Sequence, residues 1–417
     1  MTVARALDTV EAQLANQPTA LVAGYRGQLD RPTLDAAFAW LTQTNPILRT
    51  RLGHRDDRPC FDVIDEHPLR AMVGPNEPVA MLGRAATGWS PAKGLSRLVV
   101  CIGRYGGRVA MFTDHSIADG RAKFALFHDL WAAYTAIAGG RPAGPAVVRA
   151  MPAPPTTVLA ERLGRAAPTA SAPVAVASGQ GKVELTKRYV TLTARETAGL
   201  SVYAREHGLT VNGLLTGAVL ASQRRLATES ERSVEMTCVS RIDLRSRLSP
   251  GVGALETTNL SGVHEARTAV ASPADPVEIG REVARQLRDS VARRFPENDF
   301  LDRSFAERER SGAAGPTFAA VSNLGRLPEL PAPPELQLED FSIYSHSGAM
   351  AHPAYAIYTY RDRLSIQFLY RPDLYADRDM NELLDDVVRF LQALQPASSR
   401  GPADHPMPAA MDQGGTP

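Results

Sequence analysis

One short segment of the chain combines residue types that can move a proton. It reads Asp114-His115-Ser-Ile-Ala-Asp119-Gly120. A histidine has an unperturbed pKa of about 6.5, so His115 can act as a general base near neutral pH. Asp119 lies one turn further on and can hold the loop by pairing with an arginine, while Gly120 lets another backbone or a substrate come close. The segment therefore predicts acid–base chemistry centred on His115.

Structural interpretations of the same segment stay open at this point. Asp119 can serve merely as a helix N-cap, and His115 can be a hydrogen-bonded core histidine. A metal pair is a third alternative, although no further ligand lies at a telling spacing, so we expect no metal. The segment alone does not decide between catalysis and structure.

The elements around this segment give it a rigid support. It lies between a predicted strand and a predicted helix, which Gly139-Gly140 ends. The preceding two strands are joined at Tyr105-Gly-Gly107, a hairpin signal. The predicted elements of this first block are strands over 19–29, 96–103 and 108–114, a helix capped by Asp30 and stopped by Pro46, and a helix over 120–138.

Composition divides the chain into four parts. Residues 1–140 form a first α/β block that carries the motif, and residues 141–182 are a Pro/Ala-rich crossover with one short helix near 156–164. Residues 183–395 form a second α/β block, and residues 396–417 are predicted to be a disordered tail. The elements predicted in the second block are helices from Thr193 to Gly208, from Thr210 or Asn212 onward, over 276–293 and over 379–394, and strands over 234–242, 316–324 and 354–369.

Charge and motifs exclude several classes of protein. The 417 residues carry 46 basic and 45 acidic side chains, so there is no basic surplus of the kind that binds nucleic acid. No apolar run is long enough for a membrane span, and the cysteines Cys60, Cys101 and Cys238 are too far apart for a metal site. Phosphate-binding loops, the Gly-x-Ser-x-Gly elbow and His-Glu-x-x-His are absent. We expect a cytoplasmic monomer with buried, reduced cysteines.

The motif His115-x-x-x-Asp119-Gly120 resembles the His-x-x-x-Asp-Gly signature of the condensation-domain superfamily. This group includes chloramphenicol acetyltransferase, carnitine acyltransferases, plant BAHD acyltransferases and nonribosomal peptide condensation domains. Four further stretches resemble superfamily segments in the expected order, and the last two are most similar to the mycobacterial phthiocerol dimycocerosyl transferase type. These stretches are 29–49 with its closing Pro-Ile-Leu-Arg, 210–215, Ile242-Asp-Leu-Arg245 and Thr257-Thr-Asn-Leu-Ser-Gly262.

The resemblance implies a fold and a reaction. Two chloramphenicol-acetyltransferase-like lobes with mixed sheets are expected to form a V, with His115 in the middle of a channel between them. His115 would take a proton from an acceptor hydroxyl or amine, which attacks an acyl thioester of coenzyme A or a phosphopantetheinyl carrier protein. The acyl group would pass directly to a small natural product of polyketide or lipid type, with no cofactor and with O-acylation favoured.

The resemblance also assigns roles to other residues. Asp119 and Gly120 would frame the loop, with Arg245 as the partner of Asp119 and Arg241 behind it. Thr258 and Asn259 are expected to line the channel, although Asn259 can equally cap a turn. Asn323 and Arg326 are expected to face the oxyanion or the acceptor, with exposed loop positions as the simpler alternative.

The chain departs from the superfamily pattern at one position beside the motif. Many members carry a second histidine where this chain has Asp114. An acid there can raise the pKa of His115, or it can point to the opposite face of the strand. Two rival functions also stay open: a catalytically silent module that binds a carrier protein, and the same fold used for another reaction such as cyclisation, epimerisation or dehydration. The acyl group and the acceptor cannot be read from the sequence.

Overall fold

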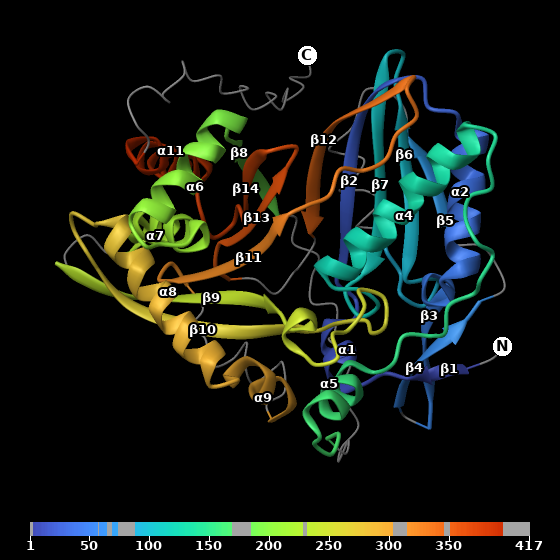
Figure 1. Cartoon of the computed structure of the whole chain (residues 1–417), viewed down its shortest axis with the longest axis horizontal. Helices are drawn as coiled ribbons and strands as arrows, with labels where there is room; N and C mark the ends of the chain where they lie inside the picture. The colour runs from blue at the N-terminus through green and yellow to red at the C-terminus, as the bar shows by residue number, and fades with distance from the viewer. Residues whose placement is uncertain are drawn as a thin grey trace.

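Two β-sheets, each covered by helices, form two lobes (Figure 1). The structure is a computed structural model, and it describes residues 3–56, 58–64, 69–73, 88–168, 185–227, 232–302, 315–345 and 351–394. Each lobe mixes helices with a sheet and has its own hydrophobic core. The predicted architecture of two mixed α/β lobes is confirmed.

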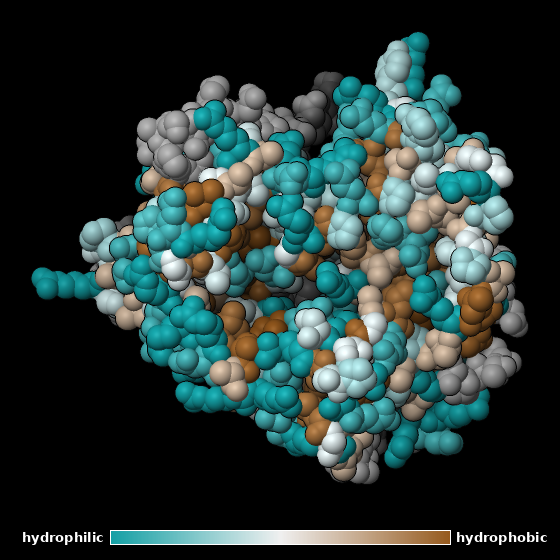
Figure 2. Space-filling view, in the orientation of Figure 1, coloured by the Kyte–Doolittle hydropathy of each residue, from teal (hydrophilic) through white to brown (hydrophobic). Residues whose placement is uncertain are grey.

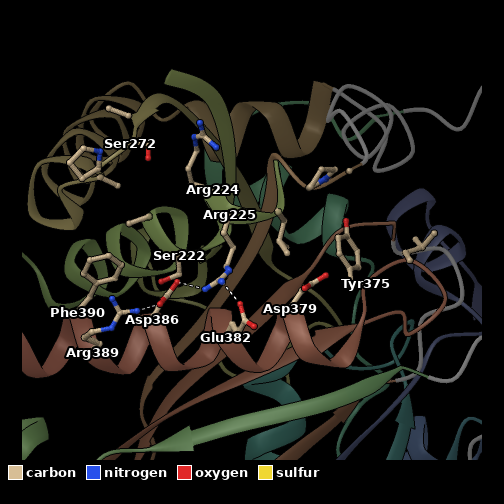
Figure 3. Close-up of a pocket in the computed structure, with 18 of the residues that line it drawn as sticks. Ser222, Arg224, Arg225, Ser272, Tyr375, Asp379, Glu382, Asp386, Arg389 and Phe390 are labelled. Carbon is tan, nitrogen blue, oxygen red and sulfur yellow. Dashed lines mark hydrogen bonds and ion pairs between the residues drawn. The ribbon is translucent and has the colours of Figure 1, made fainter. Parts of the chain in front are cut away.

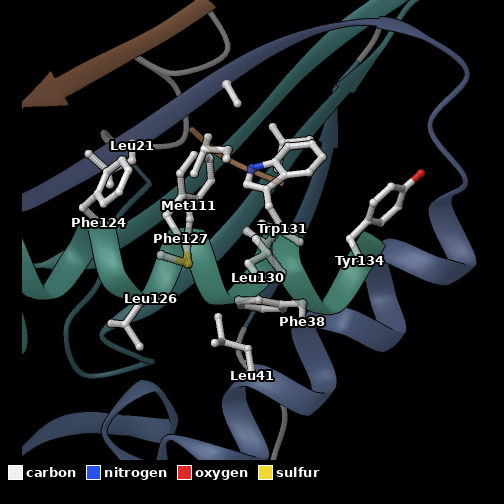
Figure 4. Close-up of a cluster of buried hydrophobic side chains, with 14 of the residues drawn as sticks. Leu21, Phe38, Leu41, Met111, Phe124, Leu126, Phe127, Leu130, Trp131 and Tyr134 are labelled. Atoms are coloured by element: carbon white, nitrogen blue, oxygen red, sulfur yellow. The ribbon is translucent and has the colours of Figure 1, made fainter. Parts of the chain in front are cut away.

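The sheet of the first lobe carries the motif at the end of its central strand. Two helices, α2 (Arg31–Thr44) and α4 (Gly120–Ala138), lie against one face of it (Figure 1). The core between them contains Phe127, Leu130 and Trp131 of α4 and Phe38 and Leu41 of α2 (Figure 4). In order, the strands are β12 (Leu336–Ser345), β2 (Pro18–Gly27), β7 (Gly106–Asp114), β6 (Ser96–Ile102) and β5 (Leu69–Val73).

A small sheet and two short helices complete this side of the molecule. The helix α1 (Thr9–Leu14) begins at a capping box, in which the Asp8 carboxylate accepts from the amide of Glu11 and the Glu11 carboxylate accepts from the amide of Asp8. The short helix α5 (Pro155–Leu163) lies in the crossover, where one was predicted. The strands of the small sheet are, in order, β1 (Val3–Ala6), β4 (Arg58–Val63) and β3 (Thr50–Arg55).

The second lobe is built on a six-stranded sheet. Its core is formed with α7, α8 and α11, whose apolar faces pack against the strands. The strands are, in order, β10 (Ser261–Ala271), β9 (Ser233–Asp243), β11 (Phe318–Arg326), β13 (Ala354–Tyr360), β14 (Arg363–Tyr370) and β8 (Thr186–Thr191). The helices are α6 (Ala194–Glu206), α7 (Val211–Gln223), α8 (Pro276–Ala292), α9 (Phe295–Asp302) and α11 (Asp377–Ala393).

Side-chain caps begin the helices where the sequence predicts them. Asp30 caps α2, and Thr193 forms a complete capping box with Glu196 at the start of α6. Of the two candidates for α7, Thr210 is the N-cap, because its hydroxyl accepts from the amide of Gly213.

Two features differ from the sequence-based expectations. The stretch predicted as strand over 354–369 is a hairpin of β13 and β14, in which Tyr360 pairs with Arg363. Its two turn residues, Arg361 and Asp362, have φ of 50° and 58°, the conformation of a type I′ turn without its usual glycine. In addition, β12 belongs to the second half of the chain but pairs with β2 in the first lobe.

Three other expectations concern the tail and crossover, membrane-spanning helices and the cysteines. The predicted tail over 396–417 and residues 169–182 of the crossover lie outside the described residues. Within the described part, no helix is long and apolar enough to cross a bilayer. Cys60, Cys101 and Cys238 are buried, as predicted, and form no disulfide with one another.

Candidate active site

The loop that carries His115 joins β7 to α4 and is tied down at both ends. The amide of Asp114 donates to the Leu95 carbonyl (2.8 Å), and the amide of His115 donates to the Gln17 carbonyl (3.0 Å). At the helix end Asp119 is the N-cap of α4, and its carboxylate accepts from the amide of Ala122 (3.0 Å). His115 is therefore presented from a fixed backbone.

His115 is uncharged at neutral pH. Burial, and then the positive charge of Lys123, lower its pKa from 6.5 to about 3, with Asp119 acting in the opposite direction. The side chain is half-buried, and its Nδ1 has no hydrogen-bond partner among the described residues. Because an uncharged imidazole keeps a free lone pair, His115 is in the protonation state that a general base requires.

Asp114, the acid beside His115, does not raise the pKa of the histidine. The pKa of His115 is lowered, so that alternative does not describe this site. The Asp114 side chain is fully buried and accepts from the amide (3.1 Å) and the hydroxyl (2.6 Å) of Ser116. Burial raises the pKa of Asp114 itself. Its visible contacts thus stabilise the first turn of the loop.

Asp119 forms a buried ion pair with Arg245, which follows β9 of the second lobe. The Arg245 Nη1 and Asp119 Oδ2 atoms are 2.7 Å apart, and both side chains are only 4% exposed. The amide of Leu260 donates to the same carboxylate oxygen (2.9 Å). Burial by itself would raise the pKa of Asp119, but Arg245 and the backbone donors outweigh it and the pKa is lowered. The pair therefore links the two lobes directly at the loop.

A second set of hydrogen bonds holds the loop and involves Glu11, a residue not identified from the sequence. The amide of Asp119 donates to the Thr258 carbonyl (2.9 Å), and the Thr258 hydroxyl donates to Glu11 of α1 (2.5 Å). Glu11 is fully buried, where it also pairs with Arg5 (2.5 Å). The capping-box spacing of Asp8 and Glu11 was a signal for the helix but not for this long-range contact.

The four residues expected to line the channel have other contacts in this structure. Thr258 and Asn259 are buried, and the Asn259 side chain accepts from the amide of Ser261 (3.0 Å), the turn-capping alternative. The amide group of Asn323 is occupied at both ends, by Asn212 (2.9 Å) and by the backbone of Gly325 (2.9 Å). Arg326 is 67% exposed and pairs with Asp362.

At Gly120 a side chain of the second lobe packs against the motif. A Cβ atom at this position would lie 2.7 Å from Cδ2 of Leu324 on β11. Real Cβ atoms do not sit that close to another carbon, so the glycine makes room for a side chain of the other lobe.

We expect Gly120→Ala to destabilise the protein by about 1–3 kcal/mol, because Leu324 must move. Helix propensity alone predicts the opposite sign, since alanine is better than glycine in a helix. Chemical denaturation of Gly120→Ala, Leu324→Ala and the double variant measures this. The double variant should regain stability relative to the sum of the single changes, and strict additivity would show that the contact is unimportant.

The face shown in Figure 2 is hollowed in its middle, between the two lobes. A separate groove of about 1110 Å³ lies on the second lobe, lined by α11 and the end of α7 (Figure 3). Its main cation, Arg225, is neutralised by Glu382 and Asp386. None of the residues that line this groove belongs to the motif, so we assign it no part in the chemistry.

Known proteins are similar to this chain in both sequence and architecture. Residues 181–369 match the family described as the C-terminus of phthiocerol/phthiodiolone dimycocerosyl transferase. The transferase of that name from Mycobacterium ulcerans is 26% identical over 400 residues, which cover 91% of this chain and 93% of the relative. The chain is a distant homologue of these transferases.

Solved structures agree with this relationship at the level of the fold. Polyketide synthase associated protein 5 from Mycobacterium tuberculosis superimposes on this chain with a TM-score of 0.77 and 22% sequence identity. The match covers 94% of this chain and 99% of the other. The first condensation domain of the calcium-dependent antibiotic synthetase superimposes with a TM-score of 0.67 and 18% sequence identity. This match covers 94% of this chain and 96% of that domain. This chain thus has the two-lobed fold of these proteins.

Proposed function

We propose that this protein transfers an acyl group from a thioester to a hydroxyl group, with His115 as the general base. The observation that carries the proposal is an uncharged imidazole on a loop held between the two lobes by Asp119 and Arg245. The family relationship supports the reaction class.

The proposed reaction needs no covalent enzyme intermediate. His115 accepts the proton of the acceptor hydroxyl while the oxygen attacks the thioester carbonyl. The tetrahedral oxyanion collapses, the C–S bond breaks, and the imidazolium returns its proton to the leaving thiolate. A general base contributes about 10²–10⁴ in rate, and the positioning of two substrates and stabilisation of the oxyanion supply the rest.

For the substrates, we propose a thioester of coenzyme A or of a phosphopantetheinyl carrier protein and a polyketide- or lipid-type alcohol. By name, the relatives transfer mycocerosyl groups to phthiocerol or phthiodiolone. An alcohol of that general kind, giving an ester product, suits a His115 that is already unprotonated.

Incubation with a panel of acyl thioesters and alcohol acceptors tests the function. Product is read by mass spectrometry and thiol release by a colorimetric reagent, with coenzyme A and carrier-protein donors in parallel and amines as competing acceptors. Release of thiol together with an ester product supports the proposal. If no pair gave either signal, or if an isomerised or cyclised product formed without an acyl donor, the proposal would be wrong.

A further inference from the structure

A buried lysine lies beside the motif and has no role in the chemistry described above. The chain has four lysines, Lys93, Lys123, Lys182 and Lys187, among its 46 basic residues, so arginine is its usual cation. Lys123 stands one turn into α4 and is only 4% exposed. A lysine is almost never buried to this degree without a compensating charge or hydrogen bond.

The surroundings of Lys123 join the elements that hold the catalytic loop. Its Nζ atom donates to the hydroxyl of Thr19 on β2, next to the end of β7, where Thr19 pairs with Thr113. Asp114, the last residue of β7, interacts favourably with its charge. Asp114 is fully buried, and its Oδ2 has no hydrogen-bond partner among the described residues, so its charge depends on a cation nearby.

We propose that Lys123 is a positioning residue of this site: its ammonium group holds Thr19 behind the catalytic loop, balances the charge of the buried Asp114 and opposes a positive charge on His115. The part of the proposal that concerns turnover rests on the acyl transfer proposed above; the part that concerns the charge of His115 does not.

Charged groups from two elements act on the histidine. Lys123 and Asp119 act on it from α4 and Arg241 acts from β9, and of these Lys123 is the largest charge effect. A cation so close makes a second positive charge on the imidazole costly. Burial also lowers the pKa of Lys123, to about 7, against the pull of Asp114 and Asp119. A lysine can respond in this way, whereas an arginine stays charged at any accessible pH.

Nuclear magnetic resonance of the full-length protein tests the proposal without any substrate. The four lysines are labelled at Cε and the histidines at Cε1, and the signals of Lys123 and His115 are assigned from Lys123→Met and His115→Gln. We expect Lys123 to titrate near pH 7 and the ring signal of His115 to sense that titration, although His115 itself does not become protonated. A ring signal of His115 that did not respond as Lys123 lost its proton would overturn the proposal, and this readout uses the wild-type protein.

The variant adds a second readout. In Lys123→Met the pKa of His115 should rise by at least about 1 pH unit toward its ordinary value, while Lys93→Met leaves it unchanged. The acid limb of kcat should move to higher pH by the same amount, and Lys123→Arg, which keeps the charge, should restore the wild-type limb. A merely structural lysine would lower the amount of folded enzyme without moving the pKa of His115, and that result would contradict the proposal.

These measurements separate the proposal from the proposed function. If wild-type enzyme transferred no acyl group while the pKa of His115 still moved in Lys123→Met, the function would be wrong and the role of Lys123 would stand. If transfer occurred but neither the pKa of His115 nor the acid limb of kcat responded to Lys123→Met, the role of Lys123 would be wrong and the proposed function would stand.

Discussion

Replacing His115 with alanine is expected to lower kcat for acyl transfer by about 10²–10⁴, the share that a positioned general base contributes. The acceptor hydroxyl then has no group to take its proton during attack. KM should change little, because His115 acts on the reacting proton and not on the rest of either substrate. Initial rates of thiol release at saturating donor and acceptor measure the effect.

The matched control is His54→Ala, at an exposed histidine of β3 in the same lobe. It should retain wild-type rates, which separates loss of the base from loss of any histidine. His115→Ala that kept more than about a tenth of the wild-type kcat would rule out the base assignment. If His115→Ala lost turnover but still bound an acyl carrier protein, the alternative of a catalytically silent binding module would be wrong, because the wild type would then use His115 for catalysis.

The largest effect on stability is expected at the buried pair of Asp119 and Arg245. Changing Arg245 to methionine leaves a carboxylate uncompensated at a position where its side chain is 4% exposed, which costs about 3–5 kcal/mol. Asp119→Asn keeps an oxygen that can cap α4 and so isolates the ion pair from the helix cap. The double variant should be more stable than the sum of the two losses, and urea denaturation of all four proteins gives the coupling.

An exposed ion pair in the same protein serves as the control. Arg326 and Asp362 are 67% and 70% exposed, and Asp362→Asn is expected to cost no more than about 1 kcal/mol. A loss in Arg245→Met as small as that would mean that the pair between the lobes contributes little. Activity should fall with the buried variants as well, because the same carboxylate fixes the loop that carries His115.

The buried pair also predicts how stability depends on pH. The pKa of Asp119 is lower in the folded protein than its ordinary value of 3.8, so the unfolded chain takes up a proton first as pH falls. The stabilising contribution is complete above about pH 4 and is lost as pH falls further, through the folded pKa. Asp119→Asn should therefore have a flatter stability profile below pH 4 than the wild type.

Much of this site could be anticipated because its signals are local. The strand, the loop and the helix that carry His115 follow one another in the chain, and caps such as Thr193 act within one turn. The pairing of Asp119 with Arg245 was expected only from a family resemblance, since spacing does not reveal an ion pair between lobes.

The remainder depends on contacts that are distant in sequence. Glu11 reaches Thr258 across the two lobes, and Lys123 reaches Thr19 within the first lobe, and both contacts are set by tertiary packing. The strand β12 shows the same limit in the backbone. Leu336 and Leu338 alternate with polar residues, a strand pattern, but nothing in that pattern indicates that the strand pairs with β2 in the other lobe.

That exchange of a strand determines the order in which the molecule can be completed. Until residues 336–345 leave the ribosome, β2 has an open edge beside a half-built sheet, and Leu338 and Phe341 are missing from the first core. An open edge of this kind is a template for pairing with any extended chain. The first lobe is therefore synthesised first but cannot close until residues 336–345 have been made, and a fragment cut at the crossover would be an aggregation-prone half and not an independent domain.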